Sequence, residues 1–496
     1  MVEKTAIFSE KRYFEEYKTI RNKLRKYGLH DILSHAFDYI YPLEVSKVER
    51  AQKLPWLVTL ILKWVLLDDM VSLNKKIKLN RHRFREILEQ VHQLSTKTRM
   101  PQDFDSTKLF MRAMAYQQFI YQEEFSLSRF SRQIALFSEL PDSHTIKRKF
   151  NDNCGIELNL FLDLSLITVF GFLNTDKKSI NNDFFQNFSS KCSQDDINNF
   201  LALISKPIVE IREVLRQKGC QRLASEYFAP SLFIEYPLIQ DGDNHFCVHP
   251  NLLFRCLENL IYDQIKSWND SKSLQKFQQS FESYVGNTMK YYKLFHFTEK
   301  QIQDSYGRSG GQIDFVIAES ESNVFIDAKG VEMPDQGKVT HSADILKDKS
   351  VHIIKAIKQA HEVLNKISEE SDKGLLRFKK ENFLIVVTFK ELNIGNGSML
   401  YEAVAKEKLD KLFSQYKELI PVENMYFVTI DEFDLLCDLA KQEQKELNHY
   451  LIKAREDDKE PQTSCFVMGM HLQKWRHNYP VFELAKNRSD WSGYTI

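Results

Sequence analysis

Residues 307–330 have the sequence GRSGGQIDFVIAESESNVFIDAKG, and this stretch decides the fold. Two runs rich in β-branched and aromatic residues flank a polar turn, which is the pattern of a β-hairpin. Three charged side chains interrupt the apolar runs: Asp314, Asp327 and Lys329. Charged groups are rarely buried in a strand without a partner or a metal. Because side chains two residues apart share a face of a strand, Asp327 and Lys329 lie on the same face.

The order of these residues resembles the signature of the PD-(D/E)XK, or restriction-endonuclease-like, nuclease superfamily. Asp314 is followed by 12 intervening residues and then by Asp327-Ala328-Lys329. The sequence departs from the family pattern at Ile313, where a proline often stands, and the second acid is Asp rather than the more frequent Glu. The alternative is a solvated edge hairpin with ordinary surface charges, and the apolar neighbours of both acids count against it.

The resemblance implies a fold and further site residues. We expect an α/β nuclease core, with a mixed sheet flanked by helices, preceded by a large, mostly α-helical N-terminal domain. Family members often carry a glutamate on the helix before the core strands, and Glu282 is the candidate here. A glutamine on the helix after the D-x-K strand orients water or a phosphate in several members, and Gln359 is the corresponding candidate. The alternative for Glu282 is an ordinary helix-surface glutamate.

The residue types at this hairpin suit a hard divalent cation. Carboxylate oxygens of Asp314 and Asp327, with a backbone carbonyl near Ala328, are ligands that Mg²⁺ or Mn²⁺ prefers, and Glu282 could join them through a water. The cation would polarise a scissile phosphate and acidify a bound water. Lys329 would position that water and balance charge that builds up on the phosphate.

The register of the hairpin decides whether this site exists. If Ala318 paired with Val324, Asp314 would face Ala328 and point away from Asp327. A shared site therefore requires a register shifted by one residue, a bulge, or a bent strand near Asp314. Gly310 and Gly311, just upstream, permit such a bend.

Composition sets broad limits on the function. The chain has 496 residues, with 68 Lys and Arg and 68 Asp and Glu, so a strong field that steers nucleic acid is absent at the level of the whole chain. Seven dispersed cysteines without a C-x-x-C pair predict reduced thiols and a cytoplasmic protein. The apolar runs 54–67 and 158–173 are too short to span a bilayer and are expected to be buried helices.

The apolar spacing along the chain divides it into four parts. Residues 1–205 are mostly helical and are expected to sense or assemble, and residues 206–265 form a hairpin and a connecting helix. Residues 266–440 form the nuclease domain, in which residues 345–367 are expected to be one helix. Residues 441–496 form a C-terminal accessory segment. Its aromatic residues could stack on bases, but packing on the domain is the expected role: Trp475, Tyr479, Phe482, Trp491 and Tyr494.

Three functions fit these observations. The first is a metal-dependent DNA endonuclease of a bacterial anti-phage defence or restriction system, a role that rests on the resemblance. The second is a non-enzymatic nucleic-acid-binding or assembly subunit on the same fold, and the third is an RNA nuclease. No P-loop is present, so ATP-driven translocation would need a separate ATPase or sensor subunit. No membrane partner is expected, no cofactor is expected besides the cation, and the sequence is compatible with a homo-oligomer.

Overall fold

The computed structural model describes residues 10–41, 53–98, 105–122, 127–173, 177–217, 224–308, 311–370 and 374–475. Within these ranges no single helix combines the length and the apolar character needed to cross a membrane. Two consecutive helices meet those criteria only when taken together, and they are bent by 66° at their junction. None of the cysteines in the same ranges forms a disulfide.

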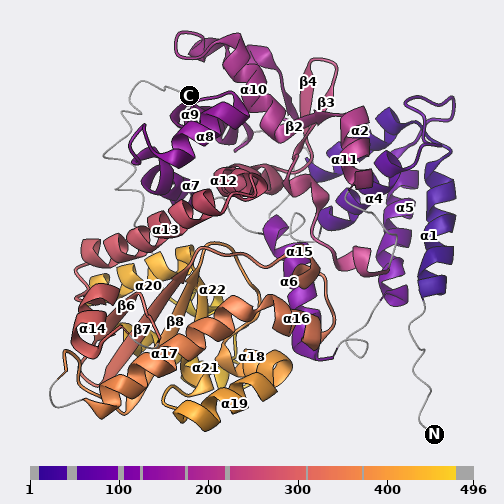
Figure 1. The fold of residues 1–496 in the computed structure, drawn as a ribbon. Helices are drawn as coiled ribbons and strands as arrows, with labels where there is room; N and C mark the ends of the chain where they lie inside the picture. The colour runs from indigo at the N-terminus through magenta and orange to yellow at the C-terminus, as the bar shows by residue number, and fades with distance from the viewer. Residues whose placement is uncertain are drawn as a thin grey trace, which may run out of the picture. The chain divides into compact units, whose positions relative to one another are not determined.

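The chain divides into two compact units (Figure 1). Unit 1 comprises residues 1–126 and 140–269, and unit 2 comprises residues 127–139 and 270–496. Residues 127–139 lie in the part of the sequence that we expected to be a helical domain, yet they belong to unit 2.

Unit 1 is helical with one small sheet. Its helices are α1 (Glu10–Leu24), α2 (Leu29–Ile40), α4 (Pro55–Leu67), α5 (Arg81–Gln93), α6 (Thr107–Gln122), α8 (Thr145–Cys154), α9 (Leu158–Phe172), α10 (Gln194–Ile204), α11 (Ile208–Gln217) and α12 (Pro250–Ser267). Its strands are β1 (Ser179–Ile180), β2 (Ser205–Pro207), β3 (Leu238–Asp241) and β4 (Asn244–Cys247), in the order β1-β4-β3-β2. The apolar helices α4 and α9 are buried, as their composition predicts.

Unit 2 is an α/β unit built on a five-stranded mixed sheet in the order β5-β6-β7-β8-β9. The strands are β5 (Phe297–Thr298), β6 (Phe315–Ala318), β7 (Ser322–Lys329), β8 (Glu381–Thr388) and β9 (Met425–Thr429). Its helices are α7 (Leu127–Gln133), α13 (Ser271–Tyr291), α14 (Glu299–Tyr306), α15 (Asp335–Lys338), α16 (Ala343–Lys349), α17 (Val351–Glu369), α18 (Gly397–Leu400), α19 (Lys406–Tyr416), α20 (Ile430–Gln442), α21 (Leu447–Asp458) and α22 (Met468–Leu472). A helical part and an α/β part are therefore both present, as the sequence predicts.

The sheet of unit 2 changes from antiparallel to parallel at β7. Strands β5, β6 and β7 pair antiparallel, whereas β7, β8 and β9 pair parallel. The strands β7 and β8 are almost continuously buried, because helices cover the sheet and a parallel strand then needs apolar residues on both faces. Helix α17 runs across one face of the sheet, and α20 packs on β8 and β9 (Figure 1).

Helix α13 packs on the end of the β6–β7 hairpin. It begins after Asp270, whose side chain accepts hydrogen bonds from the first turn, and it buries an apolar stripe that includes Phe277 and Phe281. Gly286 lets the helix approach the sheet, since a Cβ there would lie 3.0 Å from the ring of Phe315. Earlier residues of α13 reach the carboxyl end of β7, where Gln278 bonds the backbone of Ala328 and Gly330.

The turn of the hairpin is fixed by α21. The Glu319 carboxylate accepts hydrogen bonds from the backbone N–H groups of Leu447, at 2.6 Å, and Asn448, at 3.0 Å. These N–H groups begin α21 and have no partner inside the helix, so the carboxylate caps it. The described part of the segment after residue 440, up to residue 475, thus packs within unit 2, and Trp475 makes an edge contact with Tyr450. The other four aromatic residues predicted in this segment lie outside the described residues.

Two expectations about unit 2 are wrong in detail. Residues 345–367 do not form one helix, because the backbone breaks at Ser350 between α16 and α17. The sequence also predicts that Asp431 caps the helix after β9, but Thr429, with Glu432, caps the start of α20 in a capping box.

Candidate active site

The register of the β6–β7 hairpin is the one that a shared site requires. Ala318 pairs with Asn323 and Phe315 pairs with Ile326, which is a shift of one residue relative to an Ala318–Val324 pairing. Asp314 stands one residue beyond the last pair, at a bend in the backbone, and the same register continued would set it opposite Asp327. Residues directly opposite share a face of the sheet. The Asp314 side chain lies within hydrogen-bond reach of the Asp327 carboxyl group.

Asp314 lies just before β6, and its side chain replaces a backbone carbonyl as a hydrogen-bond acceptor for β7. Its Oδ2 accepts the backbone N–H of Ala328 at 2.7 Å, and its own carbonyl accepts the N–H of Glu299 at 2.8 Å. The carboxylate is therefore held against the D-x-K strand. Burial, together with the negative charges of Asp327 and Glu282, raises the pKa of Asp314 to about 8, and Lys329 and the Ala328 N–H work against that rise.

Asp327 is the most buried acid of the site, with a relative exposure of 1%. Its Oδ1 accepts a hydrogen bond from Lys329 Nζ at 2.8 Å. Its Oδ2 is buried and receives no hydrogen bond from a described residue. Burial raises the pKa of Asp327, and Lys329 works against that rise. A buried carboxylate oxygen without a hydrogen-bond partner destabilises the folded protein unless it binds a cation.

Glu282 reaches the same place from α13. Burial raises the pKa of the Glu282 carboxyl, and the negative charges of Glu299 and Asp327 add to the effect. One carboxylate oxygen each of Glu282, Glu299 and Asp314 lies within 4.8 Å of the other two, which is close enough for one metal ion to contact all three. The predicted residues Asp314, Asp327, Lys329 and Glu282 thus come together.

The glutamate at position 299 is a member of this cluster that the sequence analysis missed. It begins α14 immediately after β5, and β5 pairs with β6 so that Thr298 lies opposite Phe315. This pairing brings the start of α14 beside Asp314. The two-residue strand β5 has no clear sequence signal, so no local pattern could have linked Glu299 to the hairpin.

Gln278 is a second residue that the sequence analysis missed. Its side-chain N–H donates to the Ala328 carbonyl at 2.7 Å, and its Oε1 accepts the N–H of Gly330 at 2.8 Å. Gln278 stands one helical turn before Glu282, and this spacing is the signal that could have found it. It holds the end of β7 against α13. Its amide N–H donates to the Ala328 carbonyl, which we expected to bind a metal.

Gln359 is the predicted residue that the structure does not bring into the acid cluster. Its side-chain Oε1 is buried without a hydrogen-bond partner among the described residues. Its backbone carbonyl lies beside the segment that leads into Asp314, since a Cβ on Gly311 would come within 2.5 Å of that oxygen. Gln359 is therefore near the hairpin, but its amide oxygen makes no hydrogen bond within the described part of the chain.

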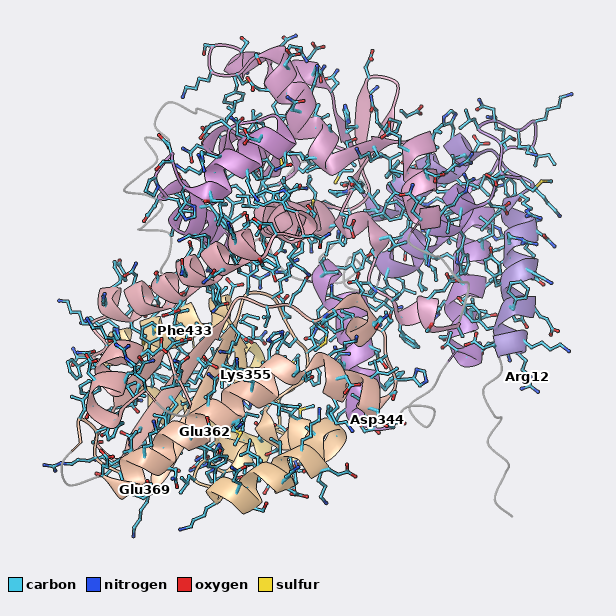
Figure 2. All side chains as sticks on the ribbon, viewed as in Figure 1. Arg12, Asp344, Lys355, Glu362, Glu369 and Phe433 are labelled. Carbon is cyan, nitrogen blue, oxygen red and sulfur yellow. The ribbon has the colours of Figure 1, made fainter. Side chains whose placement is uncertain are left out.

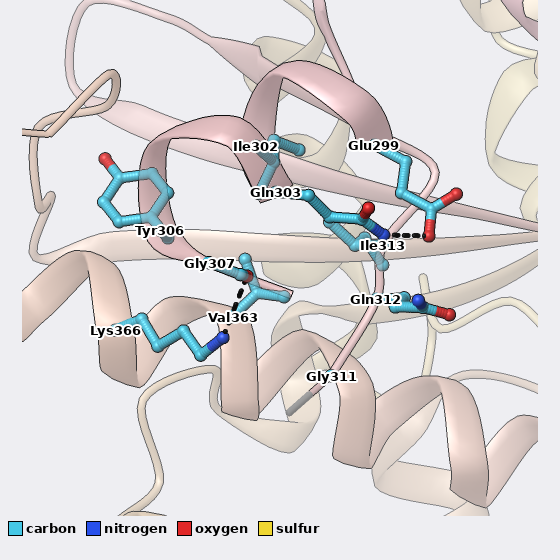
Figure 3. A pocket seen from close by; sticks show the side chains of 10 residues that line it. All are labelled: Glu299, Ile302, Gln303, Tyr306, Gly307, Gly311, Gln312, Ile313, Val363 and Lys366. Atoms are coloured by element: carbon cyan, nitrogen blue, oxygen red, sulfur yellow. Dashed lines mark hydrogen bonds between the residues drawn. The ribbon is translucent and has the colours of Figure 1, made fainter. Parts of the chain in front are cut away.

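A small pocket opens next to the acid cluster (Figure 3). It lies between α14, the residues before Asp314 and α17, and Glu299 and Gln312 line it together with Lys366. Gln303 donates to Glu299 at 2.7 Å, and Lys366 donates to the Gly307 carbonyl at 3.3 Å. Glu299 thus faces open space, unlike the buried Asp327.

Cys247, His249 and Cys256 of unit 1 lie near one another in the sequence without an evident fourth ligand, so we expect ordinary packing there rather than a zinc site. Nδ1 of His249 accepts the N–H of Asn251 at 3.1 Å and caps α12. The Cys256 thiol donates to the carbonyl of Glu235 at 3.5 Å. Within the described residues, the only group of three or more His, Cys, Asp or Glu side chains placed to hold a metal is that of Glu282, Glu299 and Asp314.

Comparison of the chain with protein-family models, with curated proteins and with solved structures finds no match. The described residues of unit 2 form an α/β unit whose mixed sheet brings carboxylates and a lysine together.

Proposed function

We propose that the chain is a metal-dependent nuclease that hydrolyses phosphodiester bonds in nucleic acid, with its chemistry in unit 2. The observation that carries the proposal is that the side chains of Asp314 and Asp327 meet beside β7, with Lys329 in contact with Asp327 and Glu282 reaching in from α13. The order of helix, hairpin, helix and parallel strand in unit 2 supports a PD-(D/E)XK nuclease core. The resemblance further suggests a role in bacterial anti-phage defence or restriction.

The residues of the site fit a divalent cation. The donors are carboxylates, the ligands that Mg²⁺ and Mn²⁺ take, and the buried Oδ2 of Asp327 receives no hydrogen bond from a described residue. Glu282, Glu299 and Asp314 lie close enough together to hold the ion, and we propose that Asp327, which stands outside that group, joins them as a ligand. A bound cation would polarise the scissile phosphate and lower the pKa of a water.

The side chains have distinct roles in the proposed reaction. Lys329 presents its ammonium group at the surface of the acid cluster, where it stabilises negative charge that develops on a phosphate oxygen. The ion pair with Asp327 fixes the position of that ammonium group. Gln278 holds the backbone on both sides of Lys329, so the lysine is oriented by the helix that also carries Glu282.

The test is incubation of the full chain with supercoiled plasmid, linear duplex DNA, single-stranded DNA and RNA, each with Mg²⁺, Mn²⁺ or EDTA. We expect cleavage of at least one substrate with either metal and none with EDTA. Cleavage of RNA alone would favour the RNA nuclease, and binding without cleavage would favour a non-enzymatic nucleic-acid-binding subunit. Absence of both cleavage and binding would contradict the proposal.

A further inference from the structure

One flank of α17 faces the residues that lead into the acid cluster. Lys366 donates to the Gly307 carbonyl. The carbonyl oxygen of Gln359 lies 2.5 Å from the position that a Cβ on Gly311 would take. Residues 3, 4 or 7 positions apart lie on the same side of a helix. His352 and Lys355 therefore continue this flank from Gln359 toward the start of α17.

The start of α17 lies beside the carboxyl end of β7. The helix connects β7 to β8, which pair parallel, so it must run back against the direction of both strands. Its first turns are then level with the end of β7, where Asp327 and Lys329 stand. The electrostatics agree, because the Lys355 charge acts on the Asp327 carboxylate, and both Lys329 and Lys355 lower the pKa of His352 in addition to the effect of burial.

Lys355 differs from the other two lysines of α17. Lys358 forms an ion pair with Glu362 at 3.5 Å, and Lys366 donates to the Gly307 carbonyl. Lys355 is exposed and forms no ion pair or hydrogen bond within the described part of the chain. Figure 2 labels Lys355 nearer the start of the helix than Glu362 and Glu369. An unpaired cation beside a buried acid is placed to meet an anion from outside.

We propose that Lys355, with His352 beside it, forms the phosphate-binding side of the site and holds a phosphate of a nucleic-acid strand next to the acid cluster. The inference rests on the proposed function and names the part of the substrate that this flank contacts. Glu282 of α13 and Glu299 of α14, with Asp314, form the cation-binding side of the site. Phosphate contacts of this kind fix where a strand lies and carry no sequence preference.

The experiment measures binding of the full chain to labelled single-stranded DNA, duplex DNA and RNA in Ca²⁺ over a series of salt concentrations. The variants are Lys355→Gln, Lys355→Arg and the matched control Lys358→Gln on the same helix. We expect Lys355→Gln to lose affinity on the order of tenfold, the scale of one hydrogen bond to a charged group. The slope of log affinity against log salt should shrink by about 0.7 to 0.9, the effect of one phosphate contact fewer.

Lys355→Arg should restore both the affinity and the slope, while Lys358→Gln should match the parent. Binding of Mn²⁺ should stay within about twofold of the parent in Lys355→Gln, because the lysine holds no cation. Parental affinity and slope in Lys355→Gln, in a protein that still cleaves nucleic acid, would overturn this inference and leave the proposed function standing. A parent chain that neither binds nor cleaves any of the three nucleic acids would overturn both.

Discussion

Lys329 and Asp327 touch each other at 2.8 Å, yet the proposed chemistry gives them different roles. We expect Lys329→Ala to keep or slightly raise the affinity for Mn²⁺, because it removes a positive charge beside the cation. Cleavage should fall by about a hundredfold or more, the scale seen when a positioned acid–base or electrostatic group is lost. The measurement is calorimetric Mn²⁺ binding beside a cleavage assay on the same preparation.

The matched control for this change is Lys379→Ala. Lys379 is half-buried and donates to the Ser320 carbonyl at the turn of the same hairpin, away from the acids. It should cleave like the parent. Parental cleavage by Lys329→Ala on every substrate would show that the D-x-K spacing is a coincidence.

The site residues that the sequence predicts are those that lie close together along the chain. Asp314, Asp327 and Lys329 belong to one hairpin, and their charges stand out against apolar neighbours. Glu299 could not be found, because only the pairing of the two-residue strand β5 brings it beside Asp314. Residue types alone also left the register open, and with it the question of whether the two acids share a face.

The packing of the end of β7 against α13 predicts the effect of a substitution that changes no charge. Gly330 has no positive φ, but a Cβ there would lie 2.8 Å from the Phe277 ring and 3.0 Å from Gln278 Oε1. Gly330→Ala should therefore push the strand end away from α13 and destabilise unit 2 by about 1 to 3 kcal/mol. Urea unfolding and the cleavage assay should both detect the change. Unchanged stability together with unchanged cleavage would show that this close approach does not position the site.

Helix α17 carries a buried histidine that makes the stability of unit 2 depend on pH. His361 is fully buried, its Nδ1 bonds the Ile357 carbonyl at 2.9 Å, and its Nε2 accepts the N–H of Ile420 at 3.4 Å. Burial lowers its pKa from 6.5, since the neutral ring is favoured there. The unfolded chain then binds the proton more readily, so stability is full above pH 6.5 and is lost as the pH falls below it.

We therefore expect the difference in unfolding free energy between the parent and His361→Gln to shrink from pH 7.5 to pH 5.5. The slope should be at most about 1.4 kcal/mol per pH unit, the value for one proton. The control is His449→Gln, because His449 is exposed, and it should follow the parent at every pH. A difference that stays constant across this pH range would contradict the assignment.

The order of elements in unit 2 is more predictable than their limits. Apolar runs of β-branched residues locate β7, β8 and β9 because buried strands have few other compositions. The break between α16 and α17 was not foreseen, since neither Gly nor Pro marks Ser350 and the apolar spacing continues across it. The capping role of Thr429 rather than Asp431 depends on backbone geometry that composition does not specify.

At the scale of the whole molecule, unit 2 includes a helix from far earlier in the chain. Arg132 of α7 bonds Asp434 of α20 at 3.0 Å across 302 positions, and it also pairs with Asp431 at 2.5 Å. Both Arg132 and Asp434 are buried, and Tyr284 and Thr288 of α13 donate to the same Asp434 carboxylate. No local pattern predicts such a contact, which is why the expected domain from residue 266 onward omits α7.

This contact predicts unequal effects from two neighbouring arginines. Arg132→Met should destabilise unit 2 by about 3 to 5 kcal/mol, because it leaves the buried Asp434 carboxylate without its cation. The matched change Arg129→Met should cost about 1 kcal/mol or less, since Arg129 pairs with Asp431 at 3.1 Å from a more exposed position. Chemical denaturation of the full chain measures both. Equal losses would argue against α7 as an integral part of unit 2.

The central claim is that Asp314 and Asp327 together hold a divalent cation, and calorimetric titration of Mn²⁺ tests it most directly. The titration compares the parent with Asp314→Asn, Asp327→Asn and Glu369→Gln, the last of which lies at the end of α17 in Figure 2. We predict saturable binding in the parent and in Glu369→Gln, and loss of that binding in both asparagine variants whose folding is intact. Equal binding in all four proteins, or no binding in the parent, would contradict the account.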